Sequence, residues 1–267
     1  MSQPQNIVIT GASSGLGLAF VKHYASLQLP PTIFAFDITP FPASQLSSLD
    51  PQDAQVNEKE GTIRSKNFYF SRVDITTADL AKHITSLNHH AQPSAISMII
   101  HCAGIRGLVP NVVHSRPGDV AAAETLAAMD YETFNRTFEI NTWGTFNVIR
   151  SLLPNLQLAA NSDTQPKVII LSSRMGSIAA NTAGGGYAYR ASKAALNAVV
   201  KSFVIDVPEV TFLLLHPGRV ETGLVAWKEE GAISVEESLG DIMKVIGGLR
   251  KEDSGRLMDR FGVDIPW

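Results

Sequence analysis

Short runs of apolar residues alternate along the chain with stretches in which apolar residues recur at helical spacing. Several of these runs, such as SMIIHC (97–102) and VIILSS (168–173), are apolar at consecutive rather than alternate positions. This pattern is typical of strands in a parallel sheet that is covered on both faces. We predict seven strands, at Asn6–Thr10, Thr32–Asp37, Asn67–Val73, Ile96–Cys102, Lys167–Ser172, Val210–His216 and Gly255–Met258.

The intervening stretches predict helices over Gly15–Leu27, Thr77–Asn88, Tyr131–Ala159, Tyr187–Asp206 and Ser234–Gly248. Strands and helices that alternate in this way, joined by right-handed crossovers, build an α/β fold of the Rossmann type. We therefore expect a doubly wound, mostly parallel seven-stranded sheet with helices on both faces. Two proline-containing segments, Thr39–Ser65 and Arg106–Ala122, are expected to be surface excursions, the second at the sheet edge where such folds bind ligands.

Composition narrows the class of protein. With 267 residues, 45% of them hydrophobic, and no linker, we expect one domain spanning residues 1–267. The net charge of −3, without a basic stripe, argues against nucleic acid as a partner. No apolar run approaches the roughly 18 residues of a membrane span. The single cysteine, Cys102, and the lack of a leader pattern favour the cytoplasm. No histidines stand at metal-ligand spacing, so we expect no metal site.

The stretch TGASSGLG connects the first predicted strand to the first predicted helix and contains Gly11, Gly15 and Gly17. A helix N-terminus offers unpaired N–H groups and a partial positive charge to a pyrophosphate, and glycines remove the Cβ atoms that would block its approach. A glycine-rich turn capped by serines is the less favoured alternative explanation of the motif alone. Asp37 favours the nucleotide site, because it ends the second strand, where an acidic side chain reaches the adenosine ribose hydroxyls.

Asp37 also bears on the choice between the two nicotinamide dinucleotides. Its carboxylate repels the 2′-phosphate that NADP carries, and Ala12–Ser14 contains no Lys or Arg to attract that phosphate. The sequence therefore predicts NAD as the cofactor, with NADP less favoured.

The stretch YAYRASK places Tyr189 and Lys193 four residues apart, on one side of a predicted helix. An ammonium group beside a phenol stabilises the phenolate and lowers a pKa that starts near 10. Such a phenol suits general acid–base chemistry at an alcohol or carbonyl. Tyr187 has Ala191 at the equivalent spacing and lacks the charge. The alternative to this chemical role is an ordinary amphipathic helix, on which the tyrosine is half-buried and the lysine lies at the surface.

With these motifs, the chain resembles the single-domain short-chain dehydrogenases/reductases, in the branch of the small carbonyl reductases. TGASSGLG and YRASK resemble the glycine loop and the Tyr-x-x-x-Lys pair of that family, and LSSRMG, EINTWGTFNV, VDIT and HPGRVETG resemble further family segments. The resemblance implies the catalytic residues Ser173, Tyr189, Lys193 and Asn141. It implies a cofactor site of Gly11, Ser13, Ser14, Gly15, Leu16, Asp37, Asp74, Ile75, Cys102, Ala103, Gly104, Tyr189, Lys193, Pro217, Gly218, Val220 and Thr222.

The implied function is hydride transfer between a nicotinamide cofactor and a secondary alcohol or ketone, a small-molecule substrate. In the implied mechanism Ser173 binds the substrate oxygen, Tyr189 exchanges its proton, Lys193 lowers the Tyr189 pKa and Asn141 holds a water. A non-redox lyase, isomerase or cyclase, or a cofactor-sensing binding protein, is the alternative, since a fold does not fix a function. The family implies a homodimer or homotetramer, and the apolar circumference of the helices Tyr131–Ala159 and Tyr187–Asp206 favours self-association.

The chain departs from the family in three places. His101 and Cys102 replace two asparagines, the first of which commonly supports the central helix, so that contact has no assigned residue. The chain has a few extra residues before Tyr189, NTAGGGYA, and the run Gly184–Gly186 within them predicts a mobile lip on the pocket. Three arginines near the pocket either bind an anionic or carbonyl-rich substrate or lie at the surface or a subunit contact, and the second explanation is favoured. They are Arg106, Arg174 and Arg219.

Overall fold

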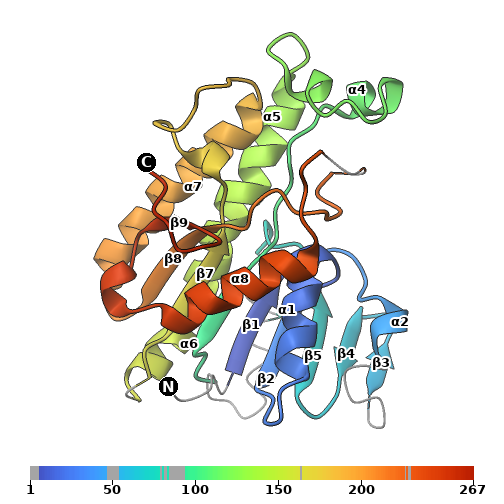
Figure 1. The fold of residues 1–267 in the computed structure, drawn as a ribbon. Coiled ribbons are helices and arrows are strands. Elements are labelled where there is room, and N and C mark those ends of the chain that lie inside the picture. Colours follow the sequence, from blue (N-terminus) through green and yellow to red (C-terminus); the bar gives the residue numbers. More distant parts are fainter. Residues whose placement is uncertain are drawn as a thin grey trace.

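The computed structural model describes residues 6–46, 54–78, 80, 83, 94–162, 164–225, 227 and 230–267. In this part of the chain nine strands form one sheet, in the order β3-β4-β5-β2-β1-β6-β7-β8-β9 (Figure 1). The strands are β1 (Asn6–Thr10), β2 (Thr32–Asp37), β3 (Gln55–Asn57), β4 (Thr62–Arg64), β5 (Phe68–Arg72), β6 (Met98–His101), β7 (Lys167–Leu171), β8 (Thr211–His216) and β9 (Leu257–Asp259).

Helices cover both faces of the sheet (Figure 1). Buried side chains of α1 and α8 contribute to one apolar core, and those of α6 and α7 contribute to the other, with α5 packed against α7. The helices are α1 (Gly15–Ala25), α2 (Ala43–Leu46), α4 (Pro110–Ser115), η2 (Ala122–Glu124), α5 (Tyr131–Phe138), the π-helical η3 (Glu139–Gly144), α6 (Thr145–Ala160), η4 (Arg174–Gly176), α7 (Tyr187–Asp206), α8 (Val235–Gly248) and η5 (Lys251–Asp253).

The seven predicted strands form the parallel part of the sheet, in the order β5-β2-β1-β6-β7-β8-β9. The doubly wound α/β class is therefore confirmed. The predicted number of strands is wrong, because β3 and β4 form an antiparallel hairpin that adds two strands beside β5. These two strands have three residues each, and Val56 is exposed whereas Ile63 is buried. Strands this short contain too few apolar residues to form a recognisable pattern.

The predicted helix Tyr131–Ala159 is divided into α5, η3 and α6, because the chain widens into a π-helical turn around Asn141. Such turns occur frequently at functional sites. The excursion Arg106–Ala122 contains the short helix α4. The predicted helix Thr77–Asn88 falls largely outside the described residues. Among the described helices, none combines the length and the apolar character that a membrane crossing requires.

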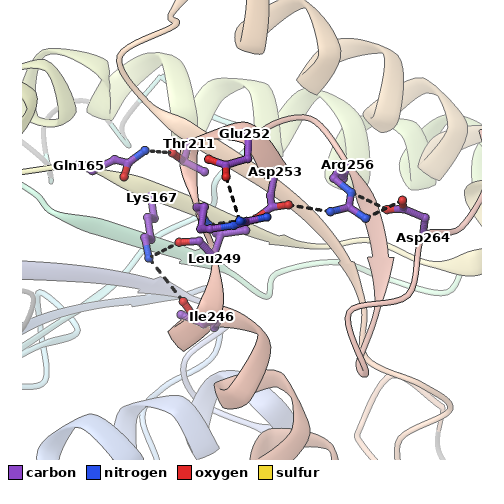
Figure 2. A network of polar contacts seen from close by, with 10 residues as sticks. Gln165, Lys167, Thr211, Ile246, Leu249, Glu252, Asp253, Arg256 and Asp264 are labelled. Atoms are coloured by element: carbon purple, nitrogen blue, oxygen red, sulfur yellow. Dashed lines mark hydrogen bonds and ion pairs between the residues drawn. The ribbon is translucent and has the colours of Figure 1, made fainter. Parts of the chain in front are cut away.

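Polar contacts fasten the last helix and strand to the sheet (Figure 2). Lys167, at the start of β7, donates from Nζ to the backbone oxygens of Leu249 and Ile246, at 3.1 and 3.5 Å, where α8 ends. Arg256 bridges the carboxylates of Asp253 and Asp264 with N···O distances of 2.6 Å. Arg256 therefore ties the segments on either side of β9 to each other.

Candidate active site

A cleft of about 570 Å³ lies at the carboxyl edge of the parallel strands. Its walls come from the loop after β1, the ends of β2 and β6, the segment after β7, the start of α7 and the loop after β8. In Figure 1 these loops lie together at the upper end of the sheet, opposite the N-terminus. The topology thus brings residues from distant segments of the sequence to one edge.

The glycine loop at one end of the cleft has the shape that a dinucleotide phosphate requires. Gly11 has φ of +65°, and a Cβ there would lie 2.8 Å from the backbone nitrogen of Ala103. A Cβ on Gly17 would lie only 2.0 Å from the Gly11 oxygen, so α1 packs directly on the loop. In the described structure α1 has no acidic residue in its first turn, and its N-cap Ser14 makes no side-chain cap. Its N-terminal N–H groups therefore suit an anion.

Asp37 lies at the rim of the same cleft, at the end of β2. Its Oδ2 accepts the Ser13 N–H, and its Oδ1 accepts the N–H and hydroxyl of Thr39, each at 2.9 Å. Ser13 is buried and donates its hydroxyl to the Thr39 oxygen. Ser13 thus orients the Asp37 carboxylate from inside the loop, whereas Ser14, Gly15 and Leu16 line the cleft.

The remaining predicted cofactor residues border the cleft. Asp74 forms a turn with Thr76, whose N–H and hydroxyl donate to Oδ1 at 2.9 and 2.7 Å, and Ile75 follows it. Thr222 approaches the glycine loop so closely that a Cβ on Gly15 would lie 3.1 Å from it. The other lining residues in the predicted set are Cys102, Ala103, Gly104, Pro217, Gly218 and Val220. A nicotinamide dinucleotide therefore fits this set of residues.

Tyr189 and Ser173 meet at the other end of the cleft. Both side chains are buried and line the cleft, and the Ser173 hydroxyl accepts the Met175 N–H at 3.1 Å. Burial raises the pKa of Tyr189 above its usual value, and a smaller contribution of the same sign comes from Glu124. The Arg106 guanidinium and the Ser173 hydrogen bond oppose this rise in pKa.

Lys193 is buried on the same side of α7 as Tyr189, as predicted, with its Nζ 5.8 Å from the centroid of the phenol ring. The Nζ donates to the Leu171 oxygen at 2.9 Å. Burial lowers the pKa of Lys193 to about 8, against an opposing effect of Cys102. The effects that lower the pKa of Tyr189 come from Arg106 and Ser173. That Lys193 lowers it as well stays a prediction.

Asn141 braces the cleft from the π-helical turn. Its Oδ1 accepts the Ile105 N–H at 2.8 Å, and its Nδ2 donates to the Ile105 oxygen at 2.9 Å and to the Ser192 hydroxyl at 3.0 Å. A Cβ on Gly104 would lie 3.1 Å from Asn141 Oδ1. The amide thus fixes the loop after β6 against α7, next to Lys193.

His101 supplies the support for the central helix that the sequence left unassigned. Its Nδ1 and Nε2 lie 2.9 Å from the hydroxyls of Thr10 and Thr145, respectively. The Thr145 hydroxyl donates its one proton to the Asn141 oxygen at 2.8 Å, so His101 donates from Nε2 and accepts at Nδ1. Burial, with a smaller effect of Lys193, lowers the pKa of His101 to about 3 and keeps the ring neutral.

The three arginines have different surroundings. Arg106 is largely buried and forms two hydrogen bonds of 2.9 Å with the carboxylate of Glu124, so the expectation of a surface arginine is wrong there. Arg219 is exposed and donates to the Glu230 oxygen at 2.8 Å. Arg174 is exposed at the cleft, and no ion pair joins it to another described residue.

The glycine run before α7 is tied to the cleft. Gly184, Gly185 and Gly186 all have positive φ, between 58° and 65°. Arg190 donates from Nε to the oxygens of Gly184 and Gly185, and the Gly186 N–H donates to the Glu124 oxygen at 3.0 Å. Within the described residues, no group of three or more His, Cys, Asp or Glu side chains is arranged to hold a metal ion.

Comparison with known proteins agrees with this geometry. Residues 5–232 match the family model of the short chain dehydrogenases, and the chain belongs to that family. It is 38% identical over 174 residues to the C-signal protein of Myxococcus xanthus, an alignment that covers 64% of this chain and 93% of that protein.

Two solved structures are similar over nearly the whole chain. The carbonyl reductase Sniffer of D. melanogaster superposes with a TM-score of 0.80 and 26% identity, covering 98% of this chain and 99% of the other. The NADPH-bound carbonyl reductase from chicken fatty liver superposes with a TM-score of 0.79 and 25% identity, with the same coverage.

Proposed function

We propose that the protein is a nicotinamide-dependent oxidoreductase that interconverts a secondary alcohol and a ketone of a small organic substrate. The observation that carries this proposal is that the buried side chains of Tyr189 and Ser173 line the same cleft as the glycine loop. Membership of the short chain dehydrogenases and the similarity to two carbonyl reductases support it.

The residues of the chain divide the work between binding and proton transfer. The N-terminus of α1 and the glycine loop would hold the pyrophosphate, Asp37 the adenosine ribose, and Asp74 and Ile75 the adenine side of the cleft. The nicotinamide supplies or accepts the hydride when it is bound. Ser173 orients the substrate oxygen by a hydrogen bond, and the Tyr189 hydroxyl gives or takes the proton of that oxygen. Lys193 and Asn141 hold the surrounding backbone at Leu171 and Ile105.

A panel of ketones and secondary alcohols, followed by the absorbance of NADH or NADPH, tests the reaction class. Tyr189→Phe should remove most of the turnover and leave nucleotide binding nearly intact, because the ring still packs and only the hydroxyl is lost. Tyr187→Phe is the matched control, since Tyr187 is two residues away, 40% exposed and without a cation at the equivalent spacing. Full activity of Tyr189→Phe would refute the assignment of the proton donor.

We further propose that NAD is preferred over NADP. The Asp37 carboxylate stands at the rim of the cleft, fixed by three hydrogen bonds, where a 2′-phosphate would meet a like charge. Arg72, the neighbour of Asp37 on β5, donates from Nε to the Ile38 oxygen at 3.0 Å. The competing possibility is that Arg72 or Arg64 receives the phosphate, and the NADPH in the chicken carbonyl reductase favours that alternative.

Calorimetry with NAD⁺ and NADP⁺ separates the two possibilities. Each hydrogen bond to a charged group contributes about 1.5–3 kcal/mol, so Asp37 should favour NAD⁺ by a factor of at least about ten. Asp37→Ala should reduce this preference, and Asp37→Ala with Ile38→Arg should reduce it further or reverse it. Asp206→Ala removes the same charge from the exposed end of α7 and serves as the control. Equal or tighter binding of NADP⁺ to the unmutated protein would overturn the NAD preference.

Self-association through α5 and α7 is proposed from the apolar side chains exposed there. Tyr131 is 85% exposed and Ile205 is 68% exposed, and Trp143 lies exposed on the turn between α5 and α6. A homodimer or homotetramer would cover these side chains. Light scattering at micromolar concentration tests this, and a monomeric mass would refute it. A cytoplasmic location stays a prediction from the sequence.

A further inference from the structure

Arg106 lines the cleft beside Tyr189 and forms an ion pair with Glu124. The side chains of Arg106 and Glu124 are only 16% and 12% exposed. The central carbon of the Arg106 guanidinium lies 4.9 Å from the centroid of the Tyr189 ring, closer than the Lys193 Nζ at 5.8 Å. Of these two cations, the one nearer to the phenol ring therefore comes from the loop after β6.

The groups that face Tyr189 come from four elements. The loop after β6 contributes Arg106 and η2 contributes Glu124, while the segment after β7 contributes the Ser173 hydroxyl. On α7 itself, Lys193 donates to the Leu171 oxygen and Arg190 donates to the two glycine oxygens of the lip. Cys102 acts on Lys193, and burial raises the pKa of its thiol, which keeps it neutral.

The ion pair is held in place by backbone contacts. The backbone oxygen of Glu124 accepts the Gly186 N–H at the start of α7. The residue whose carboxylate binds Arg106 is therefore tied to the helix that carries Tyr189. Gly107 follows Arg106 with φ of +72°, and a Cβ there would lie 2.4 Å from the Thr137 hydroxyl. Both ends of the pair are thus fixed relative to the phenol.

We propose that Arg106 is a positioning residue that acts through Tyr189: its guanidinium favours the phenolate form, Glu124 tempers this effect, and together they set the pH range of proton transfer. A cation beside a ring interacts more strongly with a phenolate than with a neutral phenol, and little solvent is present to screen it. The Glu124 carboxylate accepts two hydrogen bonds from the guanidinium and has the opposite effect on the pKa of Tyr189. The proposal rests on the proposed function only in taking Tyr189 as the proton-transfer group.

Substitutions of Arg106 and of Glu124 should shift the titration of the Tyr189 phenol in opposite directions. Arg106→Met removes the cation and leaves the carboxylate, so the phenol should titrate at higher pH than in the unmutated protein. Glu124→Gln leaves the cation without its counter-charge, so the phenol should titrate at lower pH. The double variant removes both charges and should titrate between the two single variants. A purely structural role of the pair predicts no such opposition of sign.

Two measurements test this. The first is the pH dependence of kcat/KM for alcohol oxidation, which rises as Tyr189 becomes able to accept a proton. On the rising limb, the rate should fall about tenfold in Arg106→Met and rise by up to about tenfold in Glu124→Gln. The second is a titration of the protein labelled with ¹³C at the phenol carbon of its five tyrosines, with the Tyr189 signal assigned by Tyr189→Phe.

Arg136→Met is the matched control. Arg136 also borders the cleft and pairs with a glutamate, Glu139, at 2.7 Å, but its side chain is 45% exposed and no ring contact joins it to Tyr189 in the described structure. Arg136→Met should leave the midpoint of the Tyr189 titration unchanged. If a single variant fails to fold, the other variant and the double variant still give the sign of the effect.

The outcomes separate this inference from the proposed function. Midpoints that move in opposite directions support the pair, even if no tested alcohol is oxidised, because the titration needs no turnover. Midpoints that stay unchanged, or that both move in one direction, overturn the role of Arg106. Absence of turnover with every substrate and both cofactors counts against the proposed oxidoreductase and leaves the titration result standing.

Discussion

The imidazole of His101 donates to the hydroxyl of Thr145 across the boundary between the sheet and the helical layer, at 2.9 Å. The Thr145 hydroxyl donates a hydrogen bond to the backbone oxygen of Asn141, and the Thr10 hydroxyl donates to the other ring nitrogen of His101. One neutral histidine thus connects β1, which leads into the glycine loop, with the turn that carries Asn141. This connection makes stability depend on keeping the ring uncharged.

We expect the protein to lose stability as the pH falls below about 6.5. Burial lowers the pKa of His101 to about 3 and that of His216 to about 4, whereas an unfolded histidine titrates near 6.5. Between these values the unfolded chain binds protons that the native state does not, so the free energy of unfolding decreases with falling pH by about 1.4 kcal/mol per unit per histidine. Urea unfolding between pH 7 and 4.5 should show this slope. His101→Asn should lower the slope of the free energy of unfolding against pH by about the contribution of one histidine. An unchanged slope would contradict the conclusion that His101 is buried and neutral.

The link between His101 and Thr145 should appear as an energetic coupling. His101→Leu leaves the Thr10 hydroxyl without its acceptor in a buried site, which should cost about 1–3 kcal/mol. Thr145→Val removes the other end of the link. Urea unfolding of both single variants and the double variant should give a coupling of about 0.5–3 kcal/mol, whereas additive effects would show that the two side chains act independently.

Gly17→Ala should disrupt the glycine loop, because the added methyl would lie 2.0 Å from the Gly11 oxygen and α1 would have to move away. We expect a loss of stability of at least about 2 kcal/mol, in the range of overpacked sites, together with weakened nucleotide binding. Gly240→Ala is the matched control, since Gly240 is exposed on α8 and an added Cβ meets no described atom within 4 Å. That variant should gain about 0.5–1 kcal/mol from the lower helix propensity of glycine. Thermal unfolding and calorimetry with NAD⁺ measure both effects.

Lys167→Met should loosen the end of α8, since the ammonium group donates to the backbone oxygens of Ile246 and Leu249, where the helix ends. A hydrogen bond to a charged group at a helix C-terminus contributes about 1–3 kcal/mol. Lys201→Met, at an exposed position of α7, should change the free energy of unfolding by less than about 0.5 kcal/mol. Equal effects of the two substitutions in urea unfolding would show that the contacts in Figure 2 contribute nothing specific.

Much of the fold was predictable because its strands are buried on both faces and therefore appear as continuous apolar runs. β1 and β2 have the predicted bounds, and the other parallel strands lie within two residues of them. The hairpin of β3 and β4 was not predictable, since its pairing depends on β5 rather than on its own residues. The break between α5 and α6 was missed for a similar reason, because the Asn141 contacts that accompany it involve residues distant in sequence.

The site was predictable where chemistry and spacing coincide in one short segment, as for Tyr189 and Lys193. The Arg106–Glu124 pair was not, because the two residues are separated by 18 positions and meet only through the loop after β6. His101 was visible as a departure from the family, but its partners Thr10 and Thr145 stand 91 and 44 positions away. A sequence shows which residues are unusual, and packing decides what they contact.

The β3–β4 hairpin also determines which backbone groups this side of the sheet offers to other chains. Without it, β5 would be a border strand with free N–H and C=O groups beside the strand that ends at Asp37. A border strand of that kind is a template for aggregation. Here the border is β3, with three exposed residues, Gln55, Val56 and Asn57, which leaves little length for another chain to pair with. The hairpin thus protects this border of the sheet from intermolecular strand addition.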